Sequence, residues 1–195
     1  KILFHKKVTG IAPGQSAVIY EGKDVIAGGF IMKKIDLLLE EYGESHHNKI
    51  NKLIHWICVP AIFFSIVGLV WSIPLGFLEN IKLNGFQYIN WATLAIGFVF
   101  IYYIKLSPLL SLGMMGFSAL CLYITNFLEN LIIMGEINFQ LWLIALAVFI
   151  ISWIVQFIGH EIEGKKPSFL KDLQFLLIGP AWLMHFIYKK LNIKY

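Results

Sequence analysis

Histidines gather at the edges of two apolar stretches of this chain, where their side chains could bind a metal. The segment ESHHNKINKLIHW holds His46, His47 and His55 and leads into an apolar run, and His160 and Glu163 stand at the end of another. Imidazole is a ligand for iron, zinc and copper, and ionisable groups at membrane depth are costly enough to mark functional sites. His160 and Glu163 are three residues apart, so they share a face if their helix continues. Several imidazoles with a nearby carboxylate and no thiolate favour a non-haem Fe(II) site with open positions.

The spacing within the first segment leaves two candidates for the partner of His55. At about 100° per residue, Asn48, Asn51 and His55 fall on one face of a helix. His46 is nine residues before His55, which places the two on opposite faces of a straight helix. Either the chain unwinds near Asn48 and His46 is the partner, or His47, eight residues before His55, is the better-aligned one.

The composition indicates that these side chains are held by membrane helices. Of 195 residues, 58% are hydrophobic and 14% are charged, with a mean hydropathy of +0.71, which is too little charge to cover a soluble domain. The net charge is +4 and lysine supplies all the positive residues, so no guanidinium fork is present to grip phosphate and a nucleic-acid partner is excluded. Cys58 and Cys121 lie inside apolar runs without CxxC spacing and predict buried thiols, not a disulfide framework.

The apolar runs predict an all-α integral membrane protein. Four of them have about the twenty residues that cross a hydrocarbon core, and each is expected to be a transmembrane helix: 53–78, 86–104, 106–128 and 137–159. A fifth run, 173–188, is shorter and interrupted by Gly179 and Pro180, which predicts a re-entrant or kinked segment; whether it crosses fully stays open.

Lysine placement predicts the orientation of these helices. Lysines flank the side on which the first helix starts, and only Lys82 falls in a loop of the opposite side, so the first side is expected to be cytoplasmic, in a bacterial inner membrane. Four crossings return the end of the fourth helix, with His160, to that same side. A re-entrant fifth segment would bring His185 there too, and a metal site is therefore predicted at the cytoplasmic boundary.

The first 31 residues differ from the rest and form a separate unit in this interpretation. The segment KKVTGIAPGQSAVIYEGKDVIAGGF alternates apolar and polar residues around turn signals, which predicts a β-hairpin in water. It resembles the C-terminal β-barrel end of the bacterial tRNA 2-thiouridylases, but the ATP-binding and catalytic regions of such an enzyme are absent from this chain. Residues 1–31 are either the tail of a neighbouring or fused gene, joined before Met32, or a native extension; residues 32–195 form the membrane domain.

Two separated motifs in the membrane domain carry a second resemblance. The segments YGESHHNKINKLIHWICVP and WIVQFIGHEIEGKKPSFL resemble the small membrane family typified by the fungal endoplasmic-reticulum 2-hydroxy-fatty-acid dioxygenase. The motif residues are Tyr42, His46, Asn48, Asn51, His55 and Pro60 in the first segment, and Gln156, Phe157, Gly159, His160, Glu163 and Pro167 in the second. The likeness covers residues 32 to about 190.

The resemblance implies an Fe(II)-dependent dioxygenase that uses O₂ to shorten a 2-hydroxy fatty acid by one carbon. The implied iron ligands are His46, His55, His160 and His185. Glu163, Asn51 and Gln156 are expected to act beside the metal by orienting the imidazoles, as metal-bound histidines require. Asn48, Lys165 and Lys166 are expected to bind the substrate, the lysines by attracting its carboxylate.

Two other functions compete with this one. A di-metal membrane desaturase or hydroxylase needs more histidine boxes than six histidines can supply. A non-enzymatic small membrane protein, for lipid binding or transport, would use the histidines at the membrane boundary and would line its centre with polar residues. Thr93, Ser118 and Thr125 are scattered there and none is charged, so the oxygenase is the favoured hypothesis.

Overall fold

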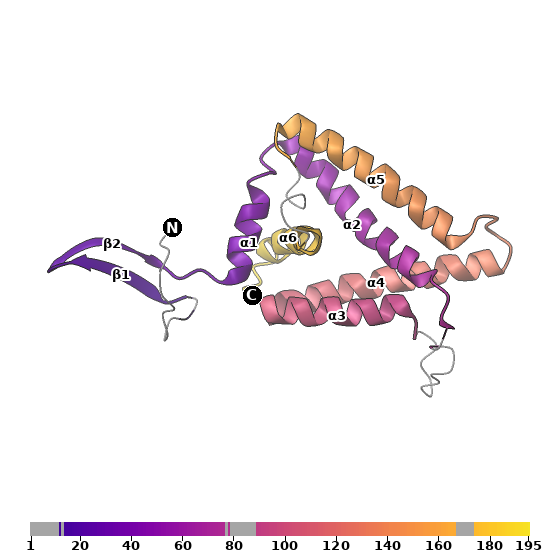
Figure 1. The fold of residues 1–195 in the computed structure, drawn as a ribbon, viewed down its shortest axis with the longest axis horizontal. Coiled ribbons are helices and arrows are strands. Elements are labelled where there is room, and N and C mark those ends of the chain that lie inside the picture. Colours follow the sequence, from indigo (N-terminus) through magenta and orange to yellow (C-terminus); the bar gives the residue numbers. More distant parts are fainter. Residues whose placement is uncertain (1–11, 13, 77, 79–88, 167–173) are drawn as a thin grey trace.

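The computed structural model describes residues 12, 14–76, 78, 89–166 and 174–195 and shows a helical body with a small sheet attached to it (Figure 1). The described elements are, in chain order, β1 Ser16–Glu21, β2 Asp24–Phe30, α1 Lys34–Gly43, α2 Lys49–Trp71, α3 Trp91–Leu106, α4 Pro108–Ile133, α5 Leu141–Glu163 and α6 Phe175–Lys190. Both the helical class and the strand pair follow the sequence-based expectation.

The two strands form the antiparallel hairpin that the turn signals predict. Glu21 pairs with Asp24, which leaves Gly22 and Lys23 as a two-residue loop. Gly22 has a φ of +62°, a backbone conformation that glycine adopts without strain and that suits such tight hairpin loops. In Figure 1 the hairpin projects away from the helices, so the histidine-bearing part of the chain is built without it.

Among the described residues, three helices are long and apolar enough to cross a membrane, namely α2, α4 and α5. The expected second crossing appears as α3, which has 16 residues and spans about 24 Å, less than the hydrocarbon core of about 30 Å. Its ends explain the length: a capping box of Asn90 and Thr93 starts α3, and Ser107 both ends it and caps α4. Four transmembrane helices are therefore not confirmed. Residues 86–88 of that run, and Lys82, lie outside the described residues.

The fifth apolar run forms one continuous helix, α6, instead of a hairpin that turns back on itself. Pro180 lies inside this helix, where it lacks the amide that would bond one turn earlier. The Tyr103 hydroxyl donates to the Leu177 carbonyl at 2.6 Å, close to that interruption. The segment from Gly179 to Leu183 is buried, so tertiary contacts support the helix around the proline.

The helices form two pairs that diverge from one end of the molecule. In Figure 1, α2 and α5 lie side by side, α3 and α4 lie side by side, and α1 and α6 occupy the wide end between the pairs. A Cβ added at Gly68 would lie 3.0 Å from the Ala145 Cβ, and one at Gly159 would lie 2.6 Å from Asn51 Oδ1, so α2 and α5 approach closely at both places. This pairing brings the start of α2 and the end of α5 together beside α1 and α6.

Candidate metal centre

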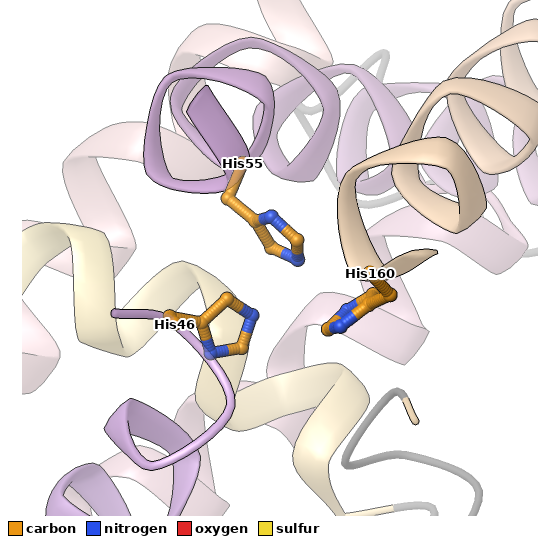
Figure 2. Close-up of side chains that lie close together, drawn as sticks. All are labelled: His46, His55 and His160. Atoms are coloured by element: carbon orange, nitrogen blue, oxygen red, sulfur yellow. The ribbon is translucent and has the colours of Figure 1, made fainter. Parts of the chain in front are cut away.

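Three histidines from three different segments point toward one another at the wide end (Figure 2). His46 lies in the loop between α1 and α2, His55 lies on α2, and His160 lies near the end of α5. One ring nitrogen of each lies within 4.8 Å of those of the other two. Their exposed fractions are 1%, 1% and 5%. The topological prediction that α2 begins where the last long helix ends is therefore confirmed in the form of a shared, buried cluster.

Backbone carbonyls orient two of the three rings. Nδ1 of His46 donates to the Tyr42 carbonyl at 2.6 Å, and Nδ1 of His55 donates to the Asn51 carbonyl at 2.9 Å, each four residues earlier. Because a carbonyl can only accept, each Nδ1 carries the proton and each Nε2 keeps a lone pair for a ligand bond. This carbonyl–imidazole arrangement is the usual support for metal-binding histidines.

The donor set fits a metal ion. Within the described part of the chain, His46 Nε2 and His160 Nδ1 are buried without a hydrogen-bond partner, which is costly unless something binds them. Burial, reinforced by the neighbouring His55, lowers the pKa of His46 to about 3, so its imidazole is neutral at physiological pH, as a ligand must be. Three neutral imidazoles are a donor set that iron, zinc and copper accept.

Of His46 and His47, the structure places His46 in the cluster. His46 is buried and its ring stacks on Tyr42, with centroids 4.4 Å apart and an interplanar angle of 16°. His47 is exposed. The helical spacing favoured His47 only for a straight helix, and the chain instead leaves α1 at Gly43 and enters α2 at Lys49, which frees His46 from that periodicity.

Glu163 acts as a clamp between two chain segments and makes no hydrogen bond to an imidazole of the three. Its carboxylate accepts from the amides of His47, at 2.7 Å, and Asn48, at 2.8 Å, and from Nδ2 of Asn51, at 3.1 Å. These amides belong to the start of α2, where a negative charge is favoured. The end of α5, with His160, is thus tied to the loop that carries His46, and the metal-capable group contains no carboxylate among the described residues.

The two asparagines also hold the backbone. Asn51 is fully buried, and its Nδ2 donates to the Ser45 carbonyl at 3.1 Å in addition to Glu163. The Asn48 side chain accepts from the Ile50 amide at 2.8 Å and so caps α2. Asn48 thus caps α2 and its contact with a substrate stays a prediction, and Asn51 supports His55 through its carbonyl.

The structure does not bring His185 to the other three histidines. On α6 it is Trp182 that packs against His46, with ring centroids 5.2 Å apart. The His185 ring instead contacts the hydroxyl of Tyr195, near the chain end. A re-entrant turn was the reason to expect His185 at the site, and the continuous α6 turns its side chain elsewhere.

The two lysines expected at the substrate lie outside the cluster. Lys165 Nζ donates to the Glu44 carbonyl at 2.6 Å, which adds a second tie between the end of α5 and the loop before α2. Lys166 is exposed. A cavity beside the histidines, described in the next paragraph, has neither lysine among its described lining residues, so their role toward a substrate stays a prediction. Pro167, a motif position, lies outside the described residues.

A cavity of about 270 Å³ opens beside the histidines, a feature that sequence reasoning did not find. Its polar wall consists of Tyr42, His55, Gln156 and His160, and its other described lining residues are apolar and come from α2, α3 and α6. Gln156, expected near the metal, is buried in this wall. Tyr42 was visible in the sequence only as a motif position. The arrangement suits an amphiphilic ligand whose polar head meets the imidazoles.

Comparisons with known proteins cover both parts of the chain. A family profile described as "2-hydroxy-palmitic acid dioxygenase Mpo1-like" matches residues 32–191. The 2-hydroxy-palmitic acid dioxygenase MPO1 of Saccharomyces cerevisiae is 29% identical over 147 residues, which is 74% of each chain.

The N-terminal residues match a different group. A profile described as "aminomethyltransferase beta-barrel domain" matches residues 1–31. The tRNA-specific 2-thiouridylases MnmA of Cytophaga hutchinsonii and Amoebophilus asiaticus are each 64% identical over 31 residues, which is 16% of this chain. The chain spans only 8% of the length of these two relatives. No solved structure matches the chain significantly.

Proposed function

Because the chain belongs, over residues 32–191, to the 2-hydroxy-palmitic acid dioxygenase Mpo1-like family, we propose that it is an Fe(II)-dependent membrane dioxygenase. It would use O₂ to shorten 2-hydroxy fatty acids by one carbon. The single observation that supports this proposal is the group of three buried imidazoles at the polar end of an apolar cavity.

His46, His55 and His160 would hold the metal. A bound ferrous ion would supply Lewis acidity and the redox chemistry that O₂ requires. The carbonyls of Tyr42 and Asn51 keep two of the rings in one tautomer and one orientation, and Glu163 keeps the His46 loop against α5. These contacts prepare the three imidazoles before any metal arrives, which lowers the cost of ordering them.

The cavity wall would place the substrate. Tyr42 and Gln156 lie in the polar wall with His55 and His160, where a hydroxyl and an amide can hydrogen-bond the carboxylate and the 2-hydroxyl of the acid. Ring burial raises the pKa of the Tyr42 hydroxyl, so it stays a proton donor to a carboxylate. The apolar remainder of the cavity would receive the acyl chain and exclude water from the head group.

The membrane supplies the substrate in this proposal. Three apolar helices support membrane association. Lys49, Lys52 and Lys165 lie at the same ends of α2 and α5 as the histidines, which under the positive-inside rule is the cytoplasmic side. We place the site there, in a bacterial inner membrane. A 2-hydroxy acid would then enter with its head at the imidazoles.

The first experiment is the metal content of anaerobically purified, full-length protein, measured by mass spectrometry beside O₂ uptake with 2-hydroxypalmitate. About one iron per chain is expected in the wild type and in His47→Ala, the exposed neighbour that serves as control. His55→Ala and His160→Ala are expected to lose both the iron and the O₂ uptake. Absence of metal, or iron retained in both variants, would favour the non-enzymatic membrane protein.

A further inference from the structure

We infer that the cavity measures the acyl chain, so that it accepts substrates of up to about seventeen carbons and excludes longer ones, and that Ala92 and Ala95 of α3 set this limit. This inference rests on the proposed function for the identity of the head group. It concerns residues that lie away from the three histidines, on a helix to which the two sequence motifs do not extend.

The cavity follows one face of α2 away from the histidines. His55, Val59, Ile62, Ile66 and Val70 line it at intervals of three or four residues, which is the spacing of a single helical face. All of these after His55 are aliphatic. The polar wall is thus confined to one end of a long apolar strip.

The length of this strip sets the length of acyl chain that it can hold, and we call this length limit the ruler. Val70 is fifteen residues beyond His55, and a helix rises about 1.5 Å per residue, so the strip is about 22 Å long. An extended saturated chain advances about 1.3 Å per carbon, because its bonds of about 1.5 Å zigzag. A strip of about 22 Å therefore accommodates about seventeen carbons, counted from a head group at the imidazoles.

The opposite wall of the cavity comes from α3. Ala92, Ala95 and Val99 lie on one face of α3, and the two alanines leave space that larger side chains would fill. Ala92 is 1% exposed and belongs to a packed cluster with Val67 and Cys121, whereas Val99 packs near the cluster that contains Tyr42. Ala92 therefore marks the end of the α3 wall that is farthest from the histidines, and Ala95 lies nearer to them.

A single acyl chain is the occupant that this shape fits. The strip is apolar throughout, has polar groups only at one end and is lined by side chains of α2, α3 and α6, which suits a chain with one polar head. The length of the chain is then the variable that the far end can sense.

The test compares wild type with Ala92→Phe, Ala95→Phe and the control Leu94→Phe, whose side chain is exposed and outside the described cavity lining. Each full-length, detergent-solubilised protein, without added metal, is titrated with straight-chain 2-hydroxy acids from about twelve to about twenty-four carbons. Thermal stabilisation reports binding, and O₂ uptake by iron-loaded protein is recorded separately.

The expected wild-type limit lies near seventeen carbons, and Leu94→Phe keeps it. Ala95 is three residues from Ala92, or about 4.5 Å, so the limit in Ala95→Phe should be about four carbons shorter than in Ala92→Phe. Each Phe variant should lose affinity for the sixteen-carbon acid about tenfold or more while it keeps the shortest acid. If Ala92→Phe does not fold, the comparison of Ala95→Phe with wild type carries the test.

Equal stabilisation by all lengths, no stabilisation by any length, or a limit that neither Phe variant moves would overturn the ruler. Binding with the expected limit but without O₂ uptake would remove the proposed enzyme and leave the ruler standing. O₂ uptake that is independent of chain length would overturn the length limit and leave the proposed enzyme standing.

Discussion

The Glu163 clamp leads to the most specific prediction. Glu163→Ala removes an ionised acceptor from the amides of His47 and Asn48 and from the side chain of Asn51. An acceptor at a helix start contributes about 1 kcal/mol and its charge adds up to about 1 kcal/mol, so the loss is about 2 kcal/mol for this partly exposed group. The carboxylate orders the His46 loop before metal binds. Without it, part of the binding free energy of the metal is spent on ordering that loop. Because a tenfold change in a binding constant corresponds to about 1.4 kcal/mol, we expect metal affinity to fall about thirtyfold.

The assay is a competition between the protein and a chelator for Fe(II) under anaerobic conditions, with thermal unfolding of the metal-free protein as a second measurement. Glu163→Gln keeps an oxygen acceptor without the charge and should lose less than Glu163→Ala. Glu161→Ala, an exposed carboxylate on the same helical turn, is the matched control and should bind as the wild type does.

Two results would refute this reasoning. An affinity within twofold of wild type in Glu163→Ala would show that the clamp does not order His46. An equal loss in Glu161→Ala would show that general charge near the site, and not the hydrogen bonds to the start of α2, is responsible. A loss of stability without a loss of affinity would separate helix packing from the metal site and would also contradict the prediction.

Three further predictions concern the helix contact, the fourth histidine and pH. Gly159→Ala places a Cβ 2.6 Å from Asn51 Oδ1 and should destabilise the protein by about 1–3 kcal/mol in thermal unfolding, whereas Gly116→Ala, with nothing within 4 Å, should be neutral or slightly stabilising. His185→Ala should keep the metal content of wild type, and a loss like that of His55→Ala would place His185 back in the ligand set. Burial, with Lys189 acting in the same direction, lowers the pKa of His185 below its ordinary 6.5. As the pH falls, the unfolded chain therefore takes up the proton before the folded chain does. The stability that depends on neutral His185 is thus present above pH 6.5 and is lost as the pH falls below it. The melting temperature between pH 7.5 and pH 5 should fall less steeply in His185→Gln, and identical slopes would contradict this assignment.

Features that depend on local sequence were predictable. The hairpin follows from alternation and a Gly-Lys turn, and the helices of the body follow from apolar runs that lipid would force to satisfy their own backbone. The meeting of His55 with His160 was also predicted, from an assumed four crossings; the structure confirms the meeting, while four membrane-crossing helices are not confirmed.

Features that depend on where helices stop were not predictable from spacing. His46 is the inward histidine because the chain leaves helical geometry between Gly43 and Lys49, and periodicity carries no information across such a break. For the same reason α3 was expected to be longer: Asn90 and Ser107 end it by capping contacts that compete with an apolar pattern running past both.

The sequence by itself determined the class of this protein, its two unrelated parts and its family, and it placed His55 and His160 among the metal-capable residues, because composition and motif are properties of the chain alone. Only the tertiary structure assigned Glu163 to backbone amides, turned His185 toward Tyr195 and left a cavity between α2, α3 and α6. The physical reason is that hydrogen-bond partners and empty space are set by contacts between segments far apart in the chain. Such contacts depend on helix ends and packing distances, which residue spacing does not contain.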